Sequence, residues 1–137
     1  MEGFRSISEQ RVVFRDLDVL GHVNNAVYST YLETARIDYL SALASEGIEA
    51  MNLIMAEITI TYKSPAFLRE TLLIGTRVSE VRNSSFIVEA QIEEKTTGRL
   101  VATSRSVIVH YDYAAGKATP IPAAWREAMA RFEGRSF

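Results

Sequence analysis

Hydrophobic and polar residues follow first a strand pattern and then a helix pattern in the N-terminal third of the chain. The strand-forming run Val12–Phe14 predicts a strand over about residues 9–16. Hydrophobic residues then recur every three or four positions, the spacing of one helix face, at Tyr28, Leu32, Ala35, Tyr39 and Leu43. We expect a long helix here, with Asn24 or Asn25 as its N-cap and Gly47 at its end.

The segment from about residue 53 to residue 112 shows the alternation of period two that is typical of strands. Four runs carry it, at Ile58–Tyr62, Leu72–Val78, Phe86–Ile92 and Val101–Val109. The links at 83–84 and 95–98 are short enough for hairpins, so we expect neighbouring strands to be antiparallel. A final helix is expected near Pro122, with its hydrophobic side formed by Trp125, Met129 and Phe132.

These elements predict an α+β fold in two layers. A five-stranded antiparallel sheet would carry one long helix across one face, followed by a short C-terminal helix. The 137 residues fit a single domain, residues 1–137. A sheet of this size keeps a face or an edge that one helix does not cover, so we also expect association with a second copy.

Composition narrows the class of protein. The net charge of -2 lacks the basic excess typical of a nucleic-acid partner. The chain has no cysteine and two histidines, and we expect neither a metal site nor another cofactor. Residues 1–10 do not resemble a signal peptide, and no apolar run reaches the roughly 20 residues of a membrane helix. We therefore expect no membrane partner and a cytoplasmic location.

The densest group of reactive side chains lies between the first strand and the long helix, at Asp16, Asp18, His22, Asn24 and Asn25. The start of a helix presents unpaired N–H groups and a partial positive charge, which stabilise a developing oxyanion. A neighbouring carboxylate attacks a carbonyl or activates water. The pattern therefore suits acyl transfer, although each of these residue types also serves as a turn or cap residue.

A resemblance decides between these interpretations. The segment Asp16–Arg36 reads D-x-D-x-x-G-H-V-N-N-x-x-Y-x-x-Y-x-E-x-A-R. It resembles the hotdog-fold acyl-CoA thioesterases of the 4-hydroxybenzoyl-CoA thioesterase family, and the segments Tyr62–Ala66 and Arg82–Phe86 agree with that family more weakly. The resemblance implies a sheet wrapped around one long helix. It also implies a homodimer or a dimer of dimers, with active sites between subunits.

The resemblance further implies roles for the loop. Asp18 matches the catalytic Asp of the family, which acts either as nucleophile or as general base; the sequence leaves both open. The backbone N–H of Asn25 would polarise the thioester carbonyl. His22 and Asn24 would shape the loop and hold water or substrate. Glu33 is a rival to Asp18, because one branch of hotdog enzymes uses a helical Glu, but we favour an ion pair between Glu33 and Arg36.

Two further groups are candidates for substrate binding. Tyr28 and Tyr31 are candidates for the acyl pocket, with core packing favoured for Tyr28, and His110 is expected to be structural. The candidates for the CoA phosphates offer cations and N–H groups: they are Lys63, Arg82, Asn83, Ser84 and Ser85. The leading hypothesis is an acyl-CoA thioesterase. The alternatives are a thioesterase that takes its acyl group from an acyl carrier protein, and a hotdog module that binds a thioester without hydrolysing it.

Overall fold

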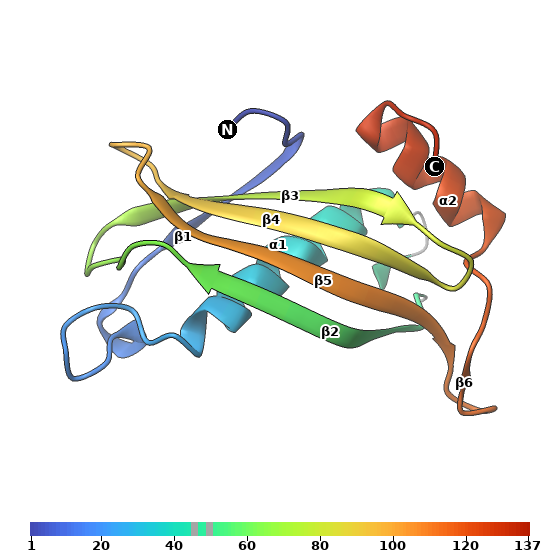
Figure 1. The fold of residues 1–137 in the computed structure, drawn as a ribbon, viewed down its shortest axis with the longest axis horizontal. Helices are drawn as coiled ribbons and strands as arrows, with labels where there is room; N and C mark the ends of the chain where they lie inside the picture. Colours follow the sequence, from blue (N-terminus) through green and yellow to red (C-terminus); the bar gives the residue numbers. More distant parts are fainter. Residues whose placement is uncertain (45–46, 49–50) are drawn as a thin grey trace.

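The computed structural model describes residues 1–44, 47–48 and 51–137, and Figure 1 shows its elements. In chain order the strands are β1 (Ser6–Arg11), β2 (Leu53–Tyr62), β3 (Thr71–Val81), β4 (Ser85–Glu94), β5 (Leu100–Asp112) and β6 (Lys117–Ala118). The helices are the short 3₁₀ helix η1 (Phe14–Asp16), α1 (Val27–Leu43) and α2 (Ala123–Glu133).

The sheet has the strand order β1-β3-β4-β5-β2, and every pair in it is antiparallel. The long helix α1 runs behind this sheet in Figure 1, and α2 lies beside the end of β3. The expected sheet, long helix and C-terminal helix are therefore confirmed. The sixth strand, β6, pairs with the end of β5. It was not predicted, because its two residues are too few to show an alternation.

The structure corrects the ends of two predicted elements. The first strand ends at Arg11, because the carboxylate of Asp16 accepts the N–H of Val13 at 3.0 Å and folds the following residues into η1. Helix α1 begins at Val27 with Ala26 as its N-cap, so neither asparagine occupies the cap position. The helix ends at Leu43, before the predicted stop at Gly47.

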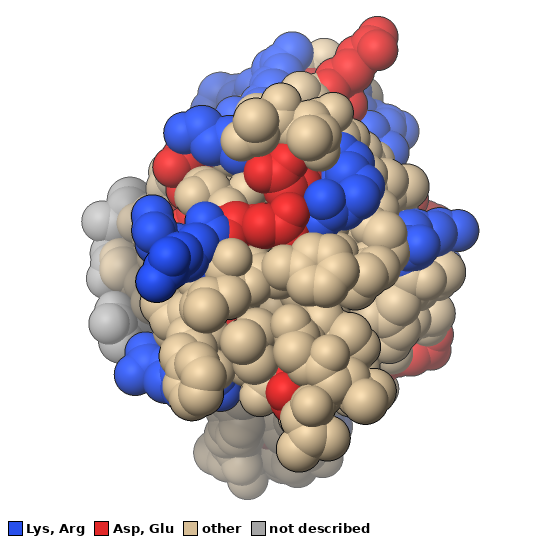
Figure 2. Space-filling view, turned by 90° about the vertical axis from the view of Figure 1, so that its left-hand side faces the viewer, with Lys and Arg blue, Asp and Glu red and all other residues tan. Residues whose placement is uncertain are grey.

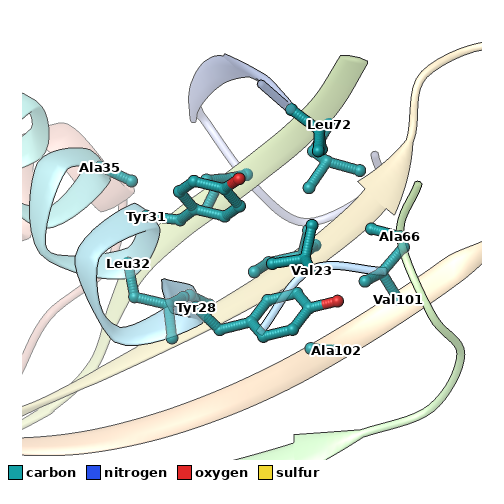
Figure 3. Packing of buried hydrophobic residues seen from close by; sticks show 13 residues of the cluster. Val23, Tyr28, Tyr31, Leu32, Ala35, Ala66, Leu72, Val101 and Ala102 are labelled. Carbon is teal, nitrogen blue, oxygen red and sulfur yellow. The ribbon is translucent and has the colours of Figure 1, made fainter. Parts of the chain in front are cut away.

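The core lies between α1 and the sheet. The predicted helix stripe is buried, with exposed fractions of 3% or less at Tyr28, Leu32, Ala35 and Tyr39. One cluster surrounds the N-terminal half of α1, where Tyr28 and Leu32 pack with Ala66, Val101 and Ala102 (Figure 3). A second cluster joins Tyr39 to Met129 of α2 and to the ends of β3 and β4.

The two edges of the sheet differ. β1 covers β3 only as far as Thr76, and beyond this point the carboxylate of Glu133 in α2 accepts the N–H of Val78 at 3.1 Å and the hydroxyl of Tyr39 at 2.6 Å. The opposite edge is β2, and among the described residues no further strand pairs with it. Ile54 on this edge is 41% exposed. A ten-residue edge strand without a partner strand is a surface for pairing with another chain.

Candidate active site

The loop between η1 and α1 is closed by Asp16. Its buried carboxylate accepts the hydroxyl of Tyr31 at 2.6 Å as well as the N–H of Val13, and its carbonyl accepts the N–H of Asn24 at 2.9 Å. Burial and the hydrogen bond to Asp16 raise the pKa of Tyr31, so this tyrosine stays a neutral donor. Asp16 therefore orients the loop, and Asp18 projects from a fixed backbone.

A second segment, residues 63–70, supports the loop from the side of the sheet. The N–H of Val23 donates to the carbonyl of Ala66 at 2.9 Å, and His22 forms a β-bridge with Phe67. The guanidinium of Arg99 holds this segment, since it donates to both carboxylate oxygens of Glu70, at 2.8 and 3.0 Å, and to the carbonyl of Pro65. Side-chain hydrogen bonds thus fix both the loop and residues 63–70, which form the two walls of the site.

A cavity of about 350 Å³ opens between the two walls. Its lining combines the polar groups of the loop with apolar side chains of α1, β2 and the following segment. The lining residues are Asp18, His22, Val23, Asn25, Tyr28, Tyr62, Lys63, Ser64 and Pro65. The structure therefore brings together three of the four predicted catalytic residues, together with Tyr28 and Lys63 from the predicted binding set.

The carboxylate of Asp18 is held at both oxygens and still reaches the cavity. Oδ1 accepts the N–H of Leu20 at 2.9 Å, and Oδ2 lies 3.4 Å from Nδ1 of His22. The side chain remains 25% exposed. Each carboxylate oxygen has two acceptor sites, so these contacts leave lone pairs for a water or a carbonyl carbon.

Asn25 faces the same cavity one residue ahead of the helix cap. The fourth predicted residue, Asn24, does not line the cavity but holds this turn, because its Oδ1 accepts the N–H of Ala26 at 3.0 Å and its carbonyl accepts that of Val27 at 2.9 Å. Among the hydrogen bonds of the described residues, the N–H of Asn25 donates none. An unpaired backbone N–H is a group that can polarise a carbonyl under attack.

Tyr31 does not line this cavity, contrary to its predicted role. Figure 3 shows that the rings of Tyr28 and Tyr31 leave α1 in different directions, Tyr28 toward Val101 and Tyr31 toward Leu72. Tyr31 is 3% exposed and donates to Asp16, so it belongs to the support of the loop. Tyr28 packs in the core and also lines the cavity, beside Tyr62 at a ring distance of 5.3 Å.

The predicted phosphate group is divided in space. Lys63 lines the cavity, whereas the link formed by Arg82, Asn83, Ser84 and Ser85, the turn after β3 and the first residue of β4, lies at the opposite end of the sheet (Figure 1). The register places Tyr62 beside Ala102, and Ala102 beside Ile92 on the next strand. Ser85 lies seven positions before Ile92 on β4, which is roughly 20 Å. Within one chain this link therefore does not line the cavity of Asp18.

The structure also tests two expectations about charged or polar residues outside the loop. Glu33 is exposed, is absent from the cavity lining, and forms no ion pair with Arg36 within the described residues. Burial lowers the pKa of Arg36, and the nearby charge of Glu33 only partly offsets this effect. His110 bonds the hydroxyl of Thr119 at 2.8 Å and packs edge-on against Trp125, in agreement with a structural role.

Tyr62, Ser64 and Pro65 were missed as site residues. Their only signal was the weak Tyr-x-x-Pro resemblance at the strand end. The described part of the chain holds no group of three or more His, Asp or Glu side chains arranged for a metal ion. It also contains no helix long and apolar enough to cross a membrane.

The end of the molecule that carries the loop has an uneven surface. Figure 2 shows charged side chains over its upper part and a broad, largely uncharged area below them. Several hydrophobic side chains of the loop and its neighbour are exposed, Val19 fully and Leu20 by 77%, with Phe67 at 46%. An exposed apolar area beside a cavity is typical of an interaction surface.

An antiparallel sheet curved around one long helix is the hotdog fold, which this chain shares with a solved thioesterase. Residues 12–129 match the model of the Thioesterase-like superfamily, and the chain belongs to this superfamily. The predicted resemblance is thus confirmed at this level, while the narrower 4-hydroxybenzoyl-CoA group remains an expectation.

Individual relatives agree with this superfamily assignment. The long-chain acyl-CoA thioesterase FadM of Escherichia coli K12 is 33% identical over 116 residues, which cover 82% of this chain and 88% of FadM. The acyl-CoA thioesterase YbgC of Haemophilus influenzae is 30% identical over 81% of this chain and 82% of its own. A thioesterase from Thermus thermophilus, solved with coenzyme A and Zn, is 34% identical with a TM-score of 0.91, and the match covers 100% of both chains.

Proposed function

We propose that this protein is an acyl-CoA thioesterase that hydrolyses its substrate to a carboxylic acid and CoA. The observation that carries the proposal is one cavity lined by Asp18, His22 and Asn25, whose backbone N–H donates no hydrogen bond among the described residues. The names of FadM and YbgC and the CoA in the Thermus thermophilus structure support an acyl-CoA as substrate. A CoA ester also agrees with the cytoplasmic location expected from the sequence.

The proposed reaction places the thioester carbonyl oxygen against the N–H of Asn25. Asp18 then either attacks the carbonyl carbon, giving a mixed anhydride that water hydrolyses, or removes a proton from the water that attacks. In both cases the carbon–sulfur bond breaks, the CoA thiolate takes up a proton, and the acid is released. His22 keeps the carboxylate oriented through its 3.4 Å contact, and Asn24 fixes the backbone that presents the N–H.

The aromatic wall formed by Tyr28 and Tyr62 suits the acyl and thioester portion of the substrate. Lys63 at the same cavity offers a cation for a CoA phosphate. The link at 82–85 enters this proposal only through a second subunit. Two β2 edges that pair antiparallel turn the partner end for end, so the partner's link comes to the end of the assembly that carries Asp18.

We therefore propose a homodimer whose interface is formed by β2. This homodimer is either the complete assembly or half of a dimer of dimers. The free ten-residue edge and the exposed Val19 and Leu20 support this assembly. The family match over residues 12–129 and the structural match over the full length support one domain, residues 1–137.

Release of free thiol from a panel of acyl-CoAs, short to long and including benzoyl-CoA, tests the proposal. Wild type is compared with Asp18→Asn, which keeps the shape of the side chain and removes its charge. Asp38→Asn is the matched control, because Asp38 is an exposed carboxylate on α1 that bonds Ser8, outside the cavity. We expect kcat to fall about 1,000-fold or more in Asp18→Asn and to change less than about twofold in the control.

Other outcomes would replace the proposal by one of its alternatives. Turnover of an acyl carrier protein thioester, with none on the CoA ester of the same acyl chain, would change the substrate carrier. Tight binding of an acyl-CoA without release of thiol from any ester would identify a binding module instead of an enzyme.

A further inference from the structure

Tyr62 connects the edge of the sheet to the start of α1. It is the last residue of β2, and its hydroxyl donates a hydrogen bond of 2.9 Å to the carbonyl of Asn25. The ring lines the cavity and packs edge-on against Tyr28, with an angle of 62° between the rings. This contact limits the rotation of the ring and so holds the hydroxyl in place.

The carbonyl of Asn25 has no place in the hydrogen-bond ladder of the helix. It lies one residue ahead of the N-cap Ala26, and the helix ladder begins only with the cap carbonyl. The neighbouring bonds at this turn, from Ala26 to the Asn24 side chain and from Val27 to the Asn24 carbonyl, are local to the turn. Among the hydrogen bonds of the described residues, the bond from Tyr62 ties Asn25 itself to the sheet.

We propose that Tyr62 is a positioning residue, which fixes the backbone of Asn25 so that its N–H points at the thioester carbonyl. This inference rests on the proposed function of Asn25 in carbonyl polarisation. Its physical basis is that a donor stabilises an oxyanion only when it is already aligned, since a displacement of about 1 Å costs about 100-fold in rate. The hydroxyl proton of Tyr62 is committed to Asn25, so Tyr62 acts through the backbone and donates nothing to the substrate.

This role predicts that Tyr62 affects the carbonyl of a ligand and not the rest of the CoA. Tyr62→Phe removes one oxygen from a side chain that is 49% exposed, and the ring that packs on Tyr28 remains. The matched control is Tyr113→Phe. Tyr113 is also exposed, and its hydroxyl donates to the carbonyl of Leu53 at 2.7 Å, at the far end of the same strand.

The first measurement is steady-state hydrolysis of the preferred acyl-CoA. We expect kcat of Tyr62→Phe to fall at least tenfold while KM stays within threefold, and Tyr113→Phe to match wild type. The second measurement is binding of two non-hydrolysable ligands. One is a ketone analogue with CH₂ in place of sulfur, which keeps the carbonyl; the other is an S-alkyl-CoA thioether, which lacks it. Tyr62→Phe should weaken the ketone at least fivefold more than the thioether.

The two measurements separate the failure of this inference from that of the proposed function. Wild type that hydrolyses no thioester contradicts the proposed function, and the ratio of ketone to thioether binding then still tests the alignment of Asn25. A wild-type kcat in Tyr62→Phe overturns the inference. Equal weakening of both ligands also overturns it, because that result assigns the Tyr62 hydroxyl to direct contact with the ligand. An unchanged melting temperature of Tyr62→Phe confirms that the comparison is made on folded protein.

Discussion

The hydroxyl of Tyr31 lies 2.6 Å from a carboxylate oxygen of Asp16, and this buried bond joins the first turns of α1 to the loop that carries Asp18. The two residues are fifteen positions apart in the chain. The bond therefore closes the loop onto the helix that follows it. It explains why a tyrosine within the family-like motif points away from the cavity.

Tyr31→Phe tests this assignment. The change removes one buried hydrogen bond to a charged acceptor, which typically contributes about 2 kcal/mol to the free energy of unfolding. We expect the midpoint of urea unfolding to fall accordingly, with KM for the acyl-CoA unchanged, because Tyr31 does not line the cavity of Asp18. A raised KM with unchanged stability would instead return Tyr31 to the acyl pocket, as the sequence predicted.

The fold was predictable because hydrophobic spacing reports which residues pack together. The stripe from Tyr28 to Tyr39 identified the buried face of α1, and the alternation of period two identified the four longer strands of the hairpin region. Spacing alone did not show where β1 ends. That end depends on the hydrogen bond that the N–H of Val13 donates to the carboxylate of Asp16, which has no hydrophobic signature.

The candidate site was predictable only where it is continuous in sequence. Asp18, His22 and Asn25 share one loop, so a motif finds them together. Tyr62 reaches the same cavity from β2, and only the register of the sheet places it there. The link at 82–85 lies far from Lys63, because one strand, β3, separates the two connections, and a strand carries the chain from one end of the sheet to the other.

Glu94 provides a test by pH. Hydrogen bonds from the hydroxyl and N–H of Thr97, both at 2.7 Å, and from the N–H of Thr96 lower the pKa of this carboxyl from 4.5 to about 2. A carboxylate with a lowered pKa stabilises the folded state fully above pH 4.5, and this contribution is lost as the pH falls toward 2. In its ionised form the carboxylate of Glu94 holds the turn between β4 and β5.

We therefore expect Glu94→Gln to be less stable than wild type at pH 7, by an amount that shrinks steadily below pH 4.5. Urea midpoints of both proteins, measured between pH 7 and pH 2.5, check this dependence. Glu93→Gln is the neighbouring control, because Glu93 bonds a side-chain amide and not the turn backbone. A stability difference that stays constant across the range would show that the Glu94 carboxylate has no lowered pKa.

If the proposed dimer forms through β2, one charged substitution on this edge strand should change both the oligomeric state and the activity. Ile54 lies on this edge and is 41% exposed in the single chain, whereas a second β2 strand paired beside it would bury it. Ile54→Lys should therefore move the protein toward monomer in sedimentation at micromolar concentration, because a lysine on a pairing edge opposes association.

Ile7→Lys is the matched control, since Ile7 is 47% exposed on β1, the opposite edge of the sheet. If the partner's link at 82–85 binds CoA, the monomeric Ile54→Lys should also show a raised KM for acyl-CoA, while its melting temperature stays close to that of a wild-type sample diluted to the monomer. Dissociation by Ile7→Lys, with Ile54→Lys unaffected, would move the interface to β1. In that arrangement the partner lies beside β1, across the sheet from the end of β2 that lines the cavity of Asp18.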